Sequence, residues 1–229
     1  RRKRRFTTMA ALAEASIVCG VDGHRIRRQF AQSLIDQGKY GAAKCILETV
    51  LQAPAPQAEK DEANGLLGRL YKQWFINPGP DAGPERPMAS VGYLHRAIEA
   101  YRGPWEAKER RNTWHGINIC ALSAWAERNL PASQRGHETS AQIAQEVLAM
   151  LSEIEANQAE PLHSFQLAAR MEAYVALQQS EEAFGLLGEY LRHPGTDAFE
   201  LQSTLRKFSE IWEMNLSSEP GDTILPVLH

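Results

Sequence analysis

The sequence has few cysteines, no long apolar run and no surplus of positive charge. Its 229 residues include three cysteines, Cys19, Cys45 and Cys120, an odd number at spacings too wide for a disulfide framework or a zinc cluster. Because apolar residues surround them, we expect all three to be reduced core residues of a cytoplasmic protein. No apolar run approaches the roughly 20 residues needed to cross a bilayer, so we expect no membrane partner.

The charge balance also excludes a function. The formal net charge is -3, with 25 lysines and arginines against 28 acidic residues. A dedicated nucleic-acid binder needs a surplus of Lys and Arg on one face, so we expect no specific nucleic-acid partner. The run Arg1–Arg5 is a local exception that fits a solvated linker, a localisation signal or a phosphate-binding arm, and we expect a basic linker or tail over residues 1–8. The chain begins without methionine, and we expect it to be part of a longer protein.

Signatures of catalysis are missing as well. The sequence has no Gly-rich phosphate loop, no Gly-x-Ser-x-Gly elbow and no His-Glu-x-x-His pair. Its seven histidines are scattered without the spacing of metal ligands, and a hydrolase would rest on these histidines alone. We therefore expect no enzyme activity, no catalytic residues, no metal and no cofactor.

Hydrophobic residues recur at spacings of three and four along almost the whole chain, which is the period of helices that bury one face. Alternating runs of Val, Ile and Thr, which would indicate strands, are missing. Helix breakers separate the periodic segments, among them Gly38, the loop-like run Asn77–Pro87, Pro131 and Pro161. The sequence therefore predicts an all-α fold of successive helical hairpins.

The hairpins recur with a period near the 34 residues of tetratricopeptide repeats. Each has a small residue where two helices would cross closely, as at Ala31, Gly68 and Ala183, and large residues to fill the surrounding grooves. This pattern predicts a tetratricopeptide-like right-handed superhelix of about four hairpins and a C-terminal capping helix. The predicted repeat domain spans 9–215, with repeats at about 24–53, 61–107, 113–155 and 163–193, the capping helix at 198–215, and a flexible tail at 216–229.

Three segments resemble one family more closely than tetratricopeptide repeats in general. They are GLLGRLYKQWF at 65–75, YLHRAIEAYRGPWEA at 93–107 and WHGINICALSAW at 114–125. They resemble the TRAFs-binding domain of stress-activated mitogen-activated protein kinase kinase kinases and its bacterial relatives, the sensor-type tetratricopeptide domains. The similarity covers roughly 32–205 and departs from the pattern at Pro104 and Trp105. It implies a regulatory module beside an effector, such as a kinase, or a protease or other toxic enzyme in bacterial conflict systems. It also implies that a nucleotide-derived signal is sensed, as proposed for the bacterial members.

In such a superhelix the first helix of each repeat lines the concave surface, with exposed positions one turn apart. Cations there offer forks for phosphate or carboxylate, and a Trp ring offers a stacking surface. A row of such cations could bind a small anion or an acidic peptide. The same residues could also be no more than a solvated helix face. Because Asn is unfavourable inside helices, we expect Asn118 to have a partner in a neighbouring helix or a ligand. The predicted ligand-binding residues are Arg28, Arg69, Lys72, His115, Asn118 and Trp125, with Phe165 and Glu172 on the same wall in the fourth repeat.

Two functions stay open from the sequence. The first is a sensor whose groove binds a small anionic, nucleotide-like signal and controls an effector domain, protease-like or kinase-like, in the same or a partner chain. The second is a scaffold that binds a peptide segment of a partner protein. In both, we expect Lys207 on the capping helix to lie outside the groove and to tolerate replacement by Ala. Four tryptophans are expected in the core or between repeats: Trp74, Trp105, Trp114 and Trp212.

Overall fold

A computed structural model describes residues 5–77, 86–107, 112–136, 138–158 and 160–228. Within these ranges the chain forms eleven α-helices and one 3-10 turn and contains no strand. The all-α prediction is therefore confirmed. The chain divides into two compact units, residues 1–107 and 108–229, and each is described by itself.

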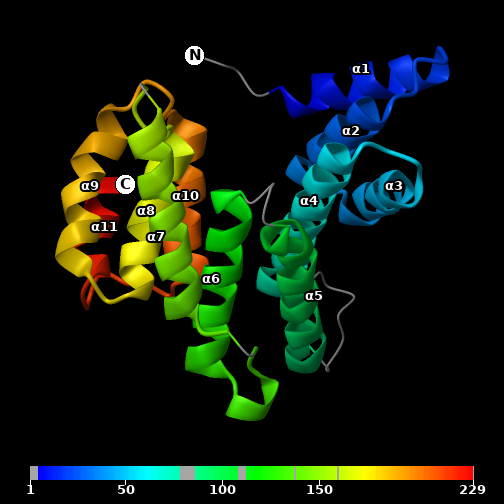
Figure 1. Ribbon diagram of the computed structural model, residues 1–229. Coiled ribbons are helices and arrows are strands. Elements are labelled where there is room, and N and C mark those ends of the chain that lie inside the picture. Colours follow the sequence, from blue (N-terminus) through cyan, green and yellow to red (C-terminus); the bar gives the residue numbers. More distant parts are fainter. Residues whose placement is uncertain (1–4, 78–85, 108–111, 137, 159, 229) are drawn as a thin grey trace. The chain divides into compact units, whose positions relative to one another are not determined.

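The first unit is a row of helices in which each helix packs on the next (Figure 1). The second and fourth helices are also in contact, as expected where the first helices of consecutive hairpins stack. The helices are α1 (Phe6–Val18), α2 (His24–Asp36), α3 (Tyr40–Gln52), α4 (Gln57–Ile76) and α5 (Arg86–Glu106).

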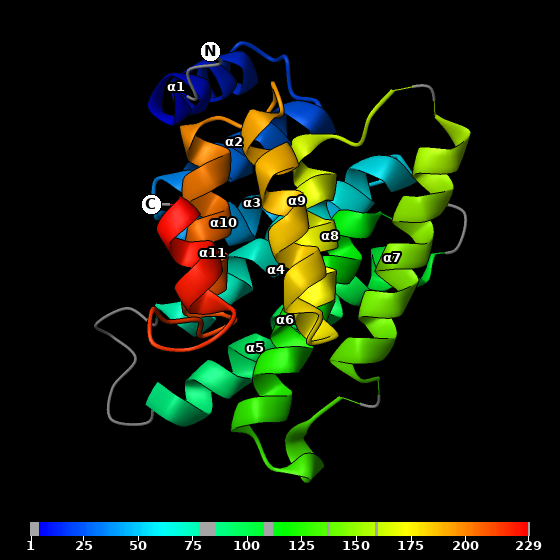
Figure 2. The ribbon, with the colours of Figure 1, turned by 90° about the vertical axis from the view of Figure 1, so that its left-hand side faces the viewer.

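The second unit repeats this arrangement and closes it with two further helices (Figure 2). Its helices are α6 (Thr113–Asn129), α7 (Ser140–Asn157), α8 (Ser164–Ala176), α9 (Ser180–Arg192), α10 (Ala198–Glu210) and α11 (Gly221–Leu228). The first four of these form two hairpins in which α8 contacts both α6 and α7, while α10 packs on α8 and α11 on α9 and α10. This sequential packing is that of a helical repeat, as predicted.

Polar residues start several helices of the second unit. The side chain of Asn112 accepts a hydrogen bond from the Trp114 amide at the start of α6. Thr139 and Gln142 form a reciprocal capping box at the start of α7, and Asp197 accepts from two amides at the start of α10. Such caps satisfy amides that have no partner inside the helix, so the helix starts are set by local sequence.

The small residues lie where the prediction puts them, in the interior between helices. Ala31, Ala97 and Ala183 are fully buried. A Cβ added to Gly68 of α4 would come within 2.8 Å of the Tyr101 ring of α5, closer than two carbon atoms can approach. The missing side chain at position 68 is therefore what allows this aromatic ring to pack against α4.

Both ends of the described chain differ from the prediction. Helix α1 begins at Phe6, inside the expected 1–8 linker, because its face packs on α2. The expected flexible tail at 216–229 contains α11, whose side chains Ile224 and Leu225 are buried. Gly221 allows this helix to approach the chain before it, since a Cβ there would lie 2.2 Å from the Asn215 carbonyl oxygen. Residues 1–4 of the basic run and most of the Asn77–Pro87 run lie outside the described residues.

The cysteines correct a second expectation. Cys120 is in the core, where its thiol donates to the Ser140 carbonyl at 3.3 Å and burial raises its pKa. Cys19 and Cys45 are exposed. Apolar neighbours in sequence did not place them in the core because Cys19 follows the last residue of α1 and Cys45 lies on the outer side of α3.

The contact at Gly68 generates a prediction about stability. Replacing Gly68 with Ala forces the Tyr101 ring away and should lower the free energy of unfolding by about 1–3 kcal/mol. The matched control is Gly92→Ala on α5, where nothing lies within 4 Å of the added Cβ and better helix propensity should stabilise by about 0.5–1 kcal/mol. Urea denaturation followed by circular dichroism measures both. Equal midpoints for Gly68→Ala and the parent would contradict the close contact.

Candidate functional site

Arg28 and Arg69 lie on α2 and α4, the first helices of consecutive hairpins. Arg28 Nε donates to Glu59 Oε2 on α4 at 2.7 Å, and Arg69 Nη2 donates to Asp36 Oδ1 on α2 at 2.5 Å. In the first pair the arginine is on α2 and the carboxylate on α4, and in the second pair the helices are exchanged. The Arg28 and Arg69 side chains are only 16% and 25% exposed. These cations therefore bind α2 to α4, and any anionic ligand would compete with carboxylates already in place.

Lys72 is half-buried on α4 and follows Tyr71 in the chain. Tyr71 is one of four aromatic rings that we call the aromatic cluster. The cluster consists of Tyr40 of α3, Tyr71 and Trp74 of α4 and Tyr93 of α5. The Trp74 and Tyr93 centroids are 5.2 Å apart, and the Tyr71 and Tyr93 rings stack at 6.3 Å with an interplanar angle of 19°. Tyr40 meets Trp74 edge-on at 6.3 Å. The rings join three helices of the first unit at distances typical of favourable aromatic pairs.

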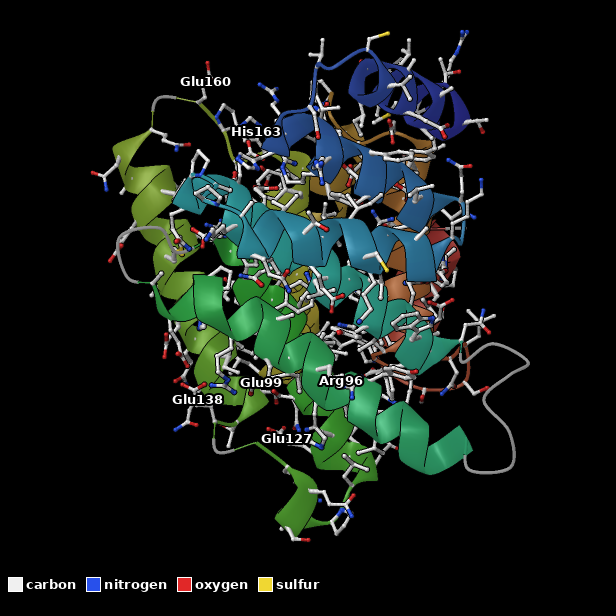
Figure 3. The ribbon with its side chains drawn as sticks, turned by 90° about the vertical axis from the view of Figure 1, so that its right-hand side faces the viewer. Arg96, Glu99, Glu127, Glu138, Glu160 and His163 are labelled. Carbon is white, nitrogen blue, oxygen red and sulfur yellow. The ribbon has the colours of Figure 1, made fainter. Side chains whose placement is uncertain are left out.

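A cation belongs to the same cluster. The guanidinium of Arg96 lies 6.0 Å from the ring centroids of both Tyr71 and Tyr93, within the range of a cation–π interaction. Arg96 is exposed on α5, one turn from Tyr93, and is labelled in Figure 3. The sequence-based selection missed Arg96 and Tyr93 because it considered only the first helix of each repeat. Their spacing of three residues on a helix that carries the family resemblance was the available signal.

His115 and Asn118 of α6 are buried, with exposures of 3% and 2%. Asn118 Nδ2 donates to the Trp114 carbonyl at 2.7 Å, so one partner of this amide is its own helix, which the sequence did not single out. The His115 ring lies edge-on to the Trp114 ring at 5.2 Å. Both positions therefore differ from the expected exposed wall, because α6 is covered along most of its length.

Trp125, the sixth predicted residue, belongs to a group that we call the Glu213 site: Trp125, Arg128 and Asn129 of α6 with Glu213 after α10. Glu213 Oε1 accepts from Trp125 Nε1 at 3.1 Å, and Oε2 accepts from Asn129 Nδ2 at 3.0 Å and Arg128 Nε at 3.3 Å. The sequence could have indicated Arg128 and Asn129, which lie three and four residues after Trp125 on one helix face. It could not have indicated Glu213, which the fold brings from 84 residues beyond Asn129.

Glu172 and Lys207 are placed differently from the prediction. The Glu172 side chain is 6% exposed and Lys207 is 13% exposed, and Lys207 Nζ lies 2.7 Å from Glu172 Oε2. Trp212 Nε1 donates to the same oxygen at 3.1 Å. The expectation that Glu172 lines an exposed wall is therefore wrong, and Lys207, which was expected to tolerate replacement by Ala, is the ion-pair partner of this buried carboxylate. Phe165 is 42% exposed and stacks on His163.

The tryptophans divide between the core and its edge. Trp105 and Trp212 are 2% and 7% exposed, as predicted for core residues, whereas Trp74 and Trp114 are half-buried. In the part of the chain that the structure describes, no group of three His, Cys, Asp or Glu residues is arranged to hold a metal ion. No helix of that part is both long and apolar enough to span a membrane.

The buried Glu172–Lys207 pair generates a second prediction. Lys207→Ala should lower the free energy of unfolding by roughly 3 kcal/mol, because it leaves a carboxylate buried without its cation. Adding Glu172→Gln to this variant should recover most of the loss, since the uncompensated charge is then gone. Arg206→Ala is the surface control; its partner Glu210 is one turn away, and such exposed pairs contribute less than about 1 kcal/mol. Thermal melts of the four proteins test the ranking, and a neutral Lys207→Ala would contradict it.

Comparisons with known proteins agree with the fold and with the resemblance. The model of the family described as Tetratricopeptide Repeats-Sensor matches residues 5–123, just over half of the 229 residues. The match covers the first unit and most of α6. No curated protein and no solved structure gave a match. The chain belongs to the Tetratricopeptide Repeats-Sensor family.

Proposed function

We propose that this chain is a regulatory module that binds a small anionic, nucleotide-like ligand and controls an effector domain in the same or a partner chain. Membership of a sensor-type repeat family supports the regulatory role. The effector would be protease-like or kinase-like, and the ligand class rests on the side chains described next. The module acts in the cytoplasm, as part of a signalling or antiviral defence system, without catalytic activity of its own.

The observation that carries the ligand class is the aromatic cluster with Arg96. Half-buried Trp74 and Tyr93 offer ring surface against which a planar base stacks. Exposed Arg96 offers a guanidinium fork suited to phosphate. Lys72, next to Tyr71 in the chain, would add a second positive charge. Stacking surface and cations in one compact unit are the combination that a nucleotide requires.

The six residues selected from the sequence have different parts in this proposal. Arg28 and Arg69 already form ion pairs with carboxylates between α2 and α4, so their part is to hold these two helices together. Among the six, Lys72 would be the direct ligand donor at the aromatic cluster, and Trp125 belongs to the second unit. His115 and Asn118 are buried, and their part is to shape α6.

A scaffold for a partner protein is the second candidate, and one observation favours it. Helix α1 and the turn after it expose Leu12, Val18 and Val21, with exposures of 64%, 82% and 58%. Exposed apolar side chains on the first described helix would suit docking of another protein if they act together. Such docking is compatible with sensing if the partner is the effector.

Isothermal titration calorimetry of the chain against nucleotides and dinucleotide-derived signals tests the proposal. At least one of them should bind with saturation. Arg96→Ala should weaken that binding about tenfold or more, because it removes a charge-assisted hydrogen bond contributing roughly 1.5–3 kcal/mol. The free energy of unfolding should change by less than about 0.5 kcal/mol, since Arg96 is exposed.

The control is Arg102→Ala on the same helix, whose guanidinium lies 3.5 Å from Glu99 and 3.4 Å from Glu106. It removes the same charge about two turns from Arg96 and should leave affinity nearly unchanged. If no nucleotide binds in the calorimetric titration, and a protein partner is recovered whose binding needs Leu12 and Val18, the chain is a scaffold and not a sensor. Equal loss in both variants would assign binding to general charge and not to the cluster.

A further inference from the structure

The Glu213 site concentrates hydrogen-bond donors on one carboxylate. An indole N–H, an amide and a guanidinium from a single stretch of α6, Trp125 to Asn129, all reach Glu213 at 3.0–3.3 Å. Three N–H donors that converge on one place need acceptor oxygens, and an anionic group supplies them. The arrangement is that of an anion-binding site whose resident anion is a side chain of the same chain.

Glu213, the residue that carries this carboxylate, has an unfavourable backbone conformation. Glu213 has φ 57, in the left-handed region where Gly is favoured and other residues are strained. It lies three residues after the end of α10, and the next amide, that of Met214, donates to the Phe208 carbonyl at 3.0 Å. Its side chain is 43% exposed and that of Arg128 is 39% exposed. The carboxylate is therefore accessible to solutes.

The donors do not depend on Glu213 for their own positions. Arg128 Nη2 donates to the Ile211 carbonyl at 2.7 Å, and the guanidinium lies 5.9 Å from the Trp212 ring centroid. Asn129 Nδ2 also donates to the Trp125 carbonyl one turn earlier, at 3.1 Å. With the carboxylate gone, these contacts would keep the guanidinium and the amide aimed at the same place. Preorganised donors of this kind lower the cost of binding an external anion.

We propose that Trp125, Arg128 and Asn129 form a phosphate-binding site, and that the Glu213 carboxylate occupies it when no ligand is bound. The ligand is a phosphoryl dianion, either inorganic phosphate or the terminal phosphate of a nucleotide. A tethered carboxylate competes at an effective concentration in the millimolar range, so a monoanion gains little by replacing it. A phosphoryl dianion carries more negative charge than the carboxylate that it replaces and offers three acceptor oxygens to the three donors, which favours phosphate over simple carboxylates.

This inference concerns the second unit and does not rest on the aromatic cluster of the first. Arg96→Ala should therefore leave phosphate binding at the Glu213 site unchanged. Substitution of Arg128 should leave stacking on the aromatic cluster unchanged. Failure of one proposal is thus distinguishable from failure of the other.

The test follows the indole N–H resonance of Trp125 in the 15N-labelled full chain, assigned by Trp125→Phe. Inorganic phosphate and a nucleoside 5′-monophosphate are titrated separately against sodium chloride at matched ionic strength. The proposal expects a saturable shift with both phosphate compounds and none with chloride. Saturation at equal concentrations identifies free phosphate as sufficient, and earlier saturation by the nucleotide shows that its nucleoside adds contacts; both outcomes support the site.

Two variants sharpen the result. Glu213→Gln should bind phosphate about tenfold more tightly than the parent, because it removes the competing charge, and Arg128→Ala should abolish saturation. Arg206→Ala, an exposed arginine of the same unit paired with Glu210, should match the parent. A Trp125 resonance that moves alike in phosphate and chloride in the parent overturns the proposal, whatever the Glu213 and Arg128 variants do. Unchanged affinity in a folded Glu213→Gln also overturns it.

Discussion

Close approach of neighbouring helices is the constraint on which both units depend. At Gly68 the Tyr101 ring occupies the space that any side chain would need, and Ala31, Ala97 and Ala183 are fully buried at comparable positions. The contact between α4 and α5 fixes how far the two helices lie apart and in what register. That register brings Tyr71 and Trp74 of one helix to Tyr93 of the other. A packing requirement in the interior thus assembles the aromatic surface at its edge.

A second rule concerns charge: several cations, two of them from the predicted basic row, form ion pairs or hydrogen bonds between helices. Arg28 and Arg69 join α2 to α4, Lys207 joins α10 to α8, and Arg128 joins α6 to the segment after α10. Pairs that are mostly covered from solvent hold helix positions more firmly than exposed pairs do, because breaking them leaves a charge without water. Positive charge open to a ligand is therefore limited to fewer positions, of which Arg96 is the clearest.

The fold could be predicted from the sequence because its signals are local. Three- and four-residue periodicity, small residues such as Gly68 and breakers such as Pro161 each act within a few turns of helix. The site could be predicted only in part. Trp125 was selected by its position in a repeat, but its partner Glu213 is 88 residues away, and no periodicity reports such a contact. The helix at 221–228 was missed for the same reason, since its short apolar face has meaning only against α9 and α10.

The pair between Asp36 and Arg69 has a consequence for how related chains can diverge. The Asp36 side chain is 5% exposed, and its Oδ2 is buried with no hydrogen-bond partner among the described residues, so this carboxylate depends on one arginine. Loss of Arg69 alone leaves a buried carboxylate, at a cost of about 3–5 kcal/mol, while joint replacement of both partners by apolar residues costs far less. A single substitution at position 69 therefore destabilises the protein during evolution, and positions 36 and 69 are expected to change together across the family.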